Sequence, residues 1–421
     1  AQAMSRLQFG DRVAPMTNLI VSNVPGPRQA LFLGTARLVH YFPGSTIAEG
    51  QGLNITVQSY EDKLDFGLVA CRRLMPDLDS LLEDIETEIA DLASLLGPTL
   101  DPAAKRVIDM TASAIANGVP PMWELSAPDA RAAYRQMSLM LGPGDEVDDV
   151  RNQTIAGPGG DLPVRIYRPT DDPNEALPAT VFYHGGGFVI GDLDTHDREC
   201  RRIARLSGGA VVSVDYRLAP EHPFPAATDD AWAALEWVLA NSDAVGVDPT
   251  RIAVAGDSAG GNLAAVTALR ARDEGIDLAF QALIYPAVDV SEGVDDKYPS
   301  RRINDGLVLS ETLNDWFITA YVGAEGIPVD SRLAPIDQNL DGVAPALVIT
   351  AGCDPLRDEG QAYAEALAAA GVDVRLTEYP GQIHGFFSMG PAIPAGWDAV
   401  AEVAATLAAA LHPSPGPNPC Q

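Results

Sequence analysis

From about residue 103 onward, short apolar runs alternate with segments of helical spacing. The runs include ATVFYH (179–184), AVVSVDY (210–216) and RIAVAG (251–256), which are rich in β-branched and aromatic residues. Each run precedes a segment whose apolar residues recur every three or four positions, the spacing of one helix face. This alternation is typical of buried, mostly parallel strands with helices on both faces of the sheet, and it predicts an α/β fold.

The same pattern covers most of the chain after residue 103. Strands are predicted at 163–169, 179–184, 210–216, 251–256, 281–288, 345–352 and 373–379. Helices are predicted at 103–117, 128–140, 196–206, 227–240, 259–273, 310–322, 359–370 and 395–411. The segment 291–330 interrupts the alternation, so we interpret it as a cap. The Pro-rich residues 412–421 are expected to be disordered.

The first 97 residues have a different texture and predict a small α+β domain. Strands are expected at 17–24 and 36–42, and residues 53–60 and 64–71 flank EDK as the two arms of a hairpin. Apolar residues at helical spacing predict an amphipathic helix over 77–96. GPTLDP (97–102) then breaks the pattern, and we place the domain boundary there.

Charge restricts the partners that the protein can have. Asp and Glu outnumber Lys and Arg by 58 to 28, which gives a net charge of −30. Such a surface repels nucleic acid and anionic membranes. No apolar run reaches the roughly 18 residues of a membrane span, and no signal-peptide pattern opens the sequence. We expect a cytoplasmic protein, and the three lysines beside abundant alanine indicate a GC-rich bacterial genome.

The cysteines and glycines exclude several kinds of site. Cys71, Cys200, Cys353 and Cys420 show no metal-binding spacing, and we interpret them as scattered thiols in a reducing compartment. Neither GxGxxG nor GxxxxGK[ST] occurs, so a nucleotide site is not expected. The sequence predicts neither a metal nor a cofactor.

The motif GDSAG (256–260) lies between a predicted strand and a predicted helix. A turn sharp enough to expose a serine there needs glycines, because strand and helix crowd its backbone. Ser258 would then lie at the positive end of the following helix, where negative charge is favoured. A bare GxSxG is a weak signal, but its place between strand and helix makes Ser258 a candidate nucleophile.

A serine nucleophile needs a base, and the base needs an acid that orients it. On this kind of sheet the chain order is Ser, acid, His. Of the six histidines, His384 follows the predicted strand 373–379, whereas His412 lies in the Pro-rich tail. Asp354 ends the preceding strand and is followed by Pro355, so it is the better acid. We expect Asp358 and Glu359 to cap the next helix.

Acyl transfer also needs hydrogen-bond donors for the oxyanion. HGGGF (184–188) follows the strand 179–184, and its glycine amides can approach a substrate closely. We expect the oxyanion hole to consist of the amides of Gly185, Gly186 and Ala259. The prediction for the substrate pocket comprises Phe188, Asp257, Tyr285, Trp316 and Phe317.

Residues from about 100 to 412 resemble the hormone-sensitive-lipase family of bacterial α/β-hydrolase esterases. The matching motifs are HGGGF (184–188), DYRLAPEHPFPAA (215–227), GDSAGGNLA (256–264), DPLRDEG (354–360) and HGF (384–386). The resemblance implies an α/β-hydrolase fold with the same triad, Ser258, Asp354 and His384. It implies a helical cap, formed by 98–150 with 291–330, over a catalytic domain at 151–411. It also implies that His184 organises its loop and that dimers form through 373–379.

Residues from about 17 to 96 resemble the C-terminal end of wax ester synthase/diacylglycerol acyltransferase proteins. SNVPGP (22–27), GLNITVQSYEDKLDFGLVA (52–70) and PDLDSLLEDI (76–85) carry this resemblance. That family's HHxxxDG motif belongs to a part that has no counterpart here, since no HH pair occurs in the sequence. We therefore expect 1–97 to be a truncated, non-catalytic domain that docks on the cap or on a second subunit.

These observations predict a serine carboxylesterase that acts on short- to medium-chain acyl esters. A lipase, a transacylase or an amidase would use the same residues, so these activities remain alternatives. A non-catalytic hydrolase-like binding protein is disfavoured because all three members of the triad are present. A lipid-tethering role for residues 1–97 is a further alternative.

Overall fold

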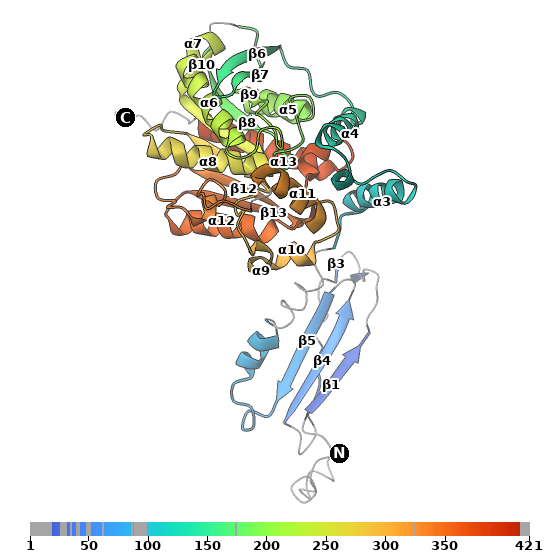
Figure 1. Ribbon diagram of the computed structural model, residues 1–421. Coiled ribbons are helices and arrows are strands. Elements are labelled where there is room, and N and C mark those ends of the chain that lie inside the picture. Colours follow the sequence, from blue (N-terminus) through green and yellow to red (C-terminus); the bar gives the residue numbers. More distant parts are fainter. Residues whose placement is uncertain are drawn as a thin grey trace, which may run out of the picture. The chain divides into compact units, whose positions relative to one another are not determined.

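The computed structural model divides the chain into two compact units, residues 1–96 and 97–421 (Figure 1). It describes residues 19–25, 32–33, 36–38, 43–47, 52–60, 63–85, 87, 99–172, 175–323 and 326–412. None of the helices in these parts combines the length and the apolar character that crossing a bilayer requires.

The larger unit contains an eight-stranded sheet. In spatial order its strands are β13 (Val374–Ile383), β12 (Ala346–Cys353), β11 (Phe280–Ile284), β10 (Val247–Asp257), β8 (Leu177–Tyr183), β9 (Ala210–Val214), β7 (Gly160–Arg168) and β6 (Asp149–Gly157). The strands from β13 to β9 are parallel, whereas β7 is antiparallel to both β9 and β6. This confirms the predicted, mostly parallel sheet.

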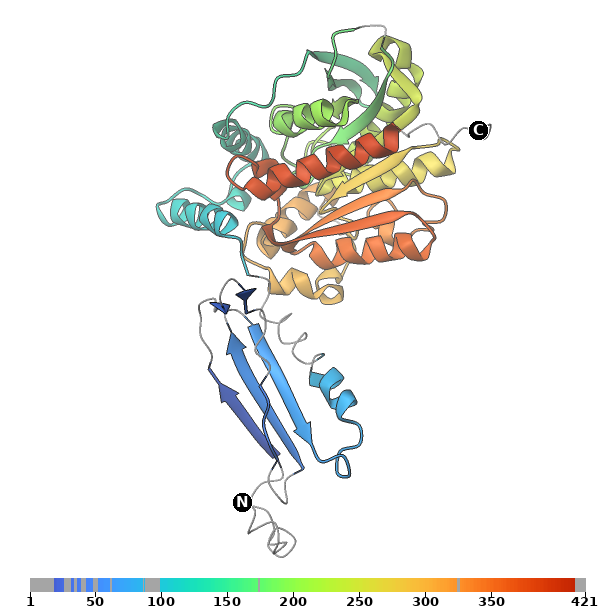
Figure 2. The same ribbon diagram turned by 180° about the vertical axis from the view of Figure 1, so that it is seen from behind.

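Helices cover both faces of the sheet. On one face lie α5 (Asp197–Ser207) and α13 (Pro394–Leu411), which Figure 2 shows in front of the strands. On the other lie α6 (Ala226–Ala240), α8 (Ala259–Asp273) and α12 (Arg357–Ala369). Neighbouring residues of β10 point to opposite faces, so Ala253 packs in one hydrophobic cluster with Val403 and Val254 in the other with Leu263.

Other helices lie outside these layers, in the two segments expected to form a cap. They are α3 (Pro102–Ala116), η2 (Met122–Glu124) and α4 (Ala127–Met140), followed later by α9 (Val294–Lys297), α10 (Pro299–Ile303) and α11 (Glu311–Val322). Polar residues cap three of them: Asp101 accepts from the amide of Ala103 at 2.7 Å, and Ser126 and Ser310 cap α4 and α11. The remaining short helices are α7 (Ser242–Val245), η3 (Pro335–Asp337) and η4 (Phe386–Met389).

The smaller unit is built on a three-stranded sheet in the order β1-β4-β5. Its strands are β1 (Leu19–Val24), β4 (Leu53–Tyr60) and β5 (Lys63–Ala70), with a two-stranded piece from β2 (Phe32–Leu33) and β3 (Ala36–Arg37). β4 and β5 pair antiparallel along their whole length, which confirms the predicted hairpin. A helix follows over 78–85.

Some sequence predictions fall on residues outside the described ranges. Of the strand predicted over 36–42, the structure describes β3 and Leu38, and of the helix predicted over 77–96 it describes 78–85 and 87. Residues 413–421 of the tail also lie outside. Within the described part, the prediction missed β6, which forms a hairpin with β7.

Candidate active site

The carboxyl ends of four parallel strands carry the predicted chemistry. HGGGF (184–188) follows β8, Ser258 follows β10, Asp354 follows β12 and His384 follows β13. Because parallel strands end at the same edge of a sheet, these residues meet although more than a hundred positions separate some of them. The sheet therefore brings the three predicted triad residues together.

A continuous chain of hydrogen bonds joins the three side chains. His384 Nε2 lies 2.8 Å from Ser258 Oγ, and His384 Nδ1 lies 2.7 Å from Asp354 Oδ2. The other oxygen of Asp354 accepts from the amide of Leu356 at 2.8 Å, which fixes the orientation of this fully buried carboxylate. In the arrangement that this carboxylate favours, Nδ1–H donates to Asp354 and Nε2 accepts from the serine hydroxyl.

The backbone at Ser258 has an unusual conformation. Its φ is +54°, in the region that non-glycine residues rarely adopt. The flanking glycines make this sharp turn possible: a Cβ at Gly256 would lie 2.2 Å from the carbonyl oxygen of Gly260, and one at Gly260 would lie 2.0 Å from that of Tyr183. The strand-to-helix turn thus projects the hydroxyl at the first residues of α8, whose leading amides lack partners within the helix.

Two opposing effects set the pKa of the His384 imidazole. Burial lowers the pKa of His384, but the adjacent Asp354 charge and its hydrogen bond outweigh this effect, so the pKa is raised above 6.5. The imidazole is therefore a stronger base than an isolated histidine.

The glycine loop differs from the prediction at one residue. The amide of Gly185 donates to Asp257 Oδ1 at 2.8 Å, so it is engaged rather than directed at the substrate. Gly186 and Gly187 line the cavity beside Ser258 together with Ala259. The Gly185 amide is thus taken up by Asp257, which corrects this part of the prediction, whereas the cavity is lined by its two neighbours in the loop and by Ala259.

Asp257 anchors this loop through a buried pair that the sequence did not reveal. Its Oδ1 lies 3.3 Å from Nε2 of the fully buried His196. Burial raises the pKa of Asp257, but His196 and the hydrogen bond from the Gly185 amide lower it by more. The net shift of this pKa is downward. For His196 the signs are reversed: burial lowers its pKa, but the Asp257 charge outweighs burial, so the net shift of this pKa is upward.

His184 is separate from the proton-transfer chain. Its Nδ1 lies 2.8 Å from the carbonyl oxygen of Gly185, and its ring stacks on Tyr216 with 4.3 Å between centroids. Burial lowers its pKa to about 4, which keeps the ring neutral near pH 7. This packing fits the loop-organising role that the family resemblance implies.

Comparisons with known proteins place this geometry in a family. Residues 180–388 match the family model described as alpha/beta hydrolase fold. Carboxylesterase NlhH of Mycobacterium tuberculosis is 43% identical over 324 residues, which are 75% of this chain and 97% of the relative. The chain belongs to the α/β-hydrolase family. The predicted membership of its hormone-sensitive-lipase group is confirmed.

Other proteins similar to this α/β hydrolase are also named as ester hydrolases. Ethyl acetate hydrolase of Pseudomonas putida is 41% identical over 285 residues, 66% of this chain and 88% of that protein. The solved hyperthermophilic esterase of the archaeon Pyrobaculum calidifontis has a TM-score of 0.69 and 44% identity, covering 74% of this chain and 98% of the esterase. Residues 1–93 match the model described as the WS/DGAT C-terminal domain, which confirms the second resemblance.

The α/β hydrolase has a mostly apolar cavity of about 170 Å³ at Ser258, which we call the active-site cavity. Its apolar lining includes Met122, Val308, Leu309, Leu313, Phe317 and Ile318. Of the predicted pocket residues, Phe188, Asp257 and Phe317 line it. Tyr285 and Trp316 do not line it. Tyr285 is fully buried, with its ring centroid 4.7 Å from that of His384, and Trp316 packs against Phe317.

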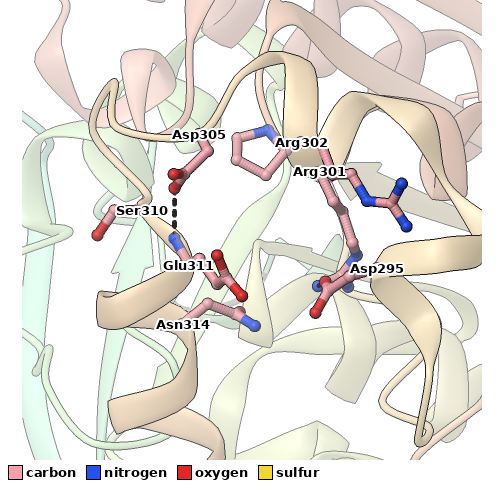
Figure 3. Close-up of a pocket in the computed structure, with 8 residues that line it drawn as sticks. Asp295, Arg301, Arg302, Asp305, Ser310, Glu311 and Asn314 are labelled. Carbon is pink, nitrogen blue, oxygen red and sulfur yellow. Dashed lines mark hydrogen bonds and ion pairs between the residues drawn. The ribbon is translucent and has the colours of Figure 1, made fainter.

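A polar cavity of about 230 Å³ lies elsewhere, mostly within the segment 291–330 (Figure 3). It is lined by Asp295, Arg301, Arg302, Asp305, Ser310, Glu311, Asn314 and Pro355. Within it Arg301 contacts Asp295 at 3.3 Å, and Asp305 accepts from the Glu311 amide at 2.7 Å. Arg301 also pairs with Glu359, and Arg302 pairs with Asp296, so both cationic side chains of this cavity have partners within the protein.

The two acids after Asp354 do not cap α12 as predicted. Asp358 accepts from the amide of Ser300 at 2.7 Å, across to α10. Glu359 is fully buried and pairs with Arg301 at 2.5 Å. Both side chains connect α10 to α12, and neither contacts the triad residues.

Proposed function

We propose that this chain is a serine carboxylesterase that hydrolyses short- to medium-chain acyl esters of small molecules. The observation that carries the proposal is the hydrogen-bonded chain from Ser258 Oγ through His384 to the buried carboxylate of Asp354. The names of the relatives, a carboxylesterase and an ethyl acetate hydrolase among them, support the same activity.

Each residue has a defined role in this proposal. Ser258 Oγ attacks the carbonyl carbon while His384 Nε2 takes its proton, and Asp354 stabilises the imidazolium. The amides of Gly186, Gly187 and Ala259 donate to the oxyanion. The bond to the alcohol then breaks as His384 protonates the leaving oxygen. Water attacks the acyl-serine with His384 as base, which releases the carboxylic acid and restores Ser258.

The cavity supports the proposed substrate class. Its volume of about 170 Å³ and its apolar lining suit a short hydrocarbon arm on each side of the ester. We assign all of this chemistry to residues 97–421, with the catalytic domain at 151–411 and the cap formed by 98–150 and 291–330.

Covalent trapping tests the proposal. A p-nitrophenyl alkylphosphonate should form a bond between phosphorus and Ser258 Oγ and release p-nitrophenol, because it resembles the tetrahedral intermediate. Intact-mass and peptide analysis should find one adduct per chain, at Ser258, and none on Ser258→Ala. An adduct at another residue, with Ser258 unmodified, would contradict the proposal.

We also propose that the protein forms a homodimer through β13. This strand is at one edge of the eight-stranded sheet, and its Leu376 is 40% exposed. An open edge offers backbone groups that a second copy can pair with. Light scattering on the full chain should give twice the mass of one chain, and Leu376→Asp should lower that mass. A single-chain mass for the unmodified protein would refute the dimer.

A further inference from the structure

A second apolar cavity lies beside the active-site cavity. It has a volume of about 240 Å³ and is lined by residues of α3, α4, α5 and η4 and by Leu141 and Ala392. Tyr134, Met137, Ser388 and Met389 line both cavities, so these four side chains form the wall between them. The second cavity is thus adjacent to the active-site cavity, although none of the triad residues lines it.

The chemistry of the lining specifies a neutral hydrocarbon ligand. Most of the lining is apolar, with Val107, Met110 and Leu141 among its members. Its one charged group, Arg198, donates to the carbonyl oxygen of Ser138 at 2.7 Å and to that of Ser388 at 3.3 Å. These bonds engage both terminal nitrogens of the guanidinium within the protein, so the cavity offers little to a carboxylate or a phosphate.

Several lining side chains of the second cavity are methionines, and two of these belong to the wall. Met389 is half-buried, whereas Met137 and Met110 are 53% and 72% exposed. Methionine is unbranched and flexible, and it adjusts readily to ligands of different shape. Exposed apolar side chains grouped around a cavity are typical of a binding site for apolar molecules. The two methionines of the wall, Met137 and Met389, can therefore move aside for a chain that passes from one cavity to the other.

The position of His384 identifies the arm of the ester that faces this wall. In the proposed reaction His384 protonates the leaving alcohol oxygen, so the alcohol arm lies on the His384 side. Ser388 and Met389 belong to η4, which begins two residues after His384. Leu313, Phe317 and Ile318 of α11 line only the active-site cavity. The acyl arm therefore has the α11 end available, and the alcohol arm faces the wall of η4.

We propose that the second cavity binds the alcohol arm of esters with longer, unbranched and uncharged alcohols, with Tyr134 and Met137 as the residues that set access to it. This inference rests on the proposed esterase function. Under this proposal the enzyme accepts longer hydrocarbon chains in the alcohol arm of the ester than in the acyl arm.

The experiment measures kcat/KM of the full chain on two ester series. Ethyl, butyl and octyl acetate lengthen only the alcohol, and ethyl acetate, butyrate and octanoate lengthen only the acyl group. Thr111→Trp, on α3, and Ala392→Phe, after η4, fill the second cavity from opposite elements, and both residues line that cavity alone. Ala112→Trp, the control, introduces tryptophan at an exposed position of α3 that lines neither cavity.

Each filling variant should lower the ratio of octyl acetate to ethyl acetate at least about tenfold, since a few methylenes lost from an apolar pocket have effects of this size. The ratio of ethyl octanoate to ethyl acetate should stay within about twofold of the wild-type value, as should both ratios in Ala112→Trp. Thermal midpoints establish that the variants are folded. An unchanged octyl ratio in both folded filling variants, or a loss confined to the acyl series, would overturn the assignment. Failure of the esterase proposal is distinguishable, because ethyl acetate hydrolysis would then persist in Ser258→Ala.

Discussion

Ser258→Ala is expected to lower kcat for p-nitrophenyl butyrate about 10⁴- to 10⁶-fold, the range found when a triad serine is removed. The variant keeps the oxyanion donors and the cavity, so KM should change little and a small residual rate over water should remain. A stopped or continuous assay of p-nitrophenol release over a range of substrate concentrations measures both kcat and KM.

The double variant Ser258→Ala/His384→Ala provides the control for this loss. Because Ser258 and His384 act as one unit across their 2.8 Å hydrogen bond, removing both should be about as harmful as removing one. Two large losses that multiply would mean that the residues act independently. Wild-type rates in Ser258→Ala would show that the ester is cleaved elsewhere.

Asp354→Asn is expected to lower kcat about 10³- to 10⁴-fold through its effect on His384. The carboxylate now accepts from His384 Nδ1 at 2.7 Å, and an amide cannot hold the same tautomer or stabilise the imidazolium. Neutral His384 is the active base, so kcat/KM of the wild type should rise with pH with a midpoint above 6.5, because Asp354 outweighs burial and raises this pKa. In Asp354→Asn the midpoint should move to lower pH.

Asp358→Asn is the matched control for Asp354→Asn. Asp358 lies in the first turn of α12 and contacts Ser300, away from the triad. Its pH–rate profile should superimpose on that of the wild type, with kcat within about threefold, as for a substitution outside the reacting groups. A downward shift of the midpoint in Asp358→Asn, with none in Asp354→Asn, would reverse the assignment of the acid.

The buried strands and helices were predictable because burial imposes a simple pattern on them. β8, β9 and β11 are buried along their whole length, so each appears as a continuous apolar run. β6 was missed for the opposite reason: most of its residues, DVRNQTIAG, are exposed, and no apolar alternation marks them. Its pairing with β7 stabilises it instead, and a single-sequence pattern does not contain that information.

The triad followed from chain order, but the details of the oxyanion loop did not. HGGGF shows that glycine amides are available, whereas the choice among them depends on how Asp257 engages Gly185. That contact joins residues 72 positions apart, and the partner of Asp257, His196, has no motif that links it to the site. The second cavity has the same origin, since it arises only when α3, α4 and η4 pack together.

The crowding around the catalytic glycines has a consequence for anyone who redesigns this enzyme. At Gly186 and Gly187 an added methyl would lie 2.2 Å from Ile190 or Phe317, just as it would overlap backbone at Gly256 and Gly260. Variant libraries that randomise these glycines should therefore yield mostly inactive enzymes. If the second cavity holds the alcohol arm, as proposed, the exposed methionines of α3 and α4 that line it are the better positions for changing selectivity, because they are distant in sequence from the triad and the glycine turns.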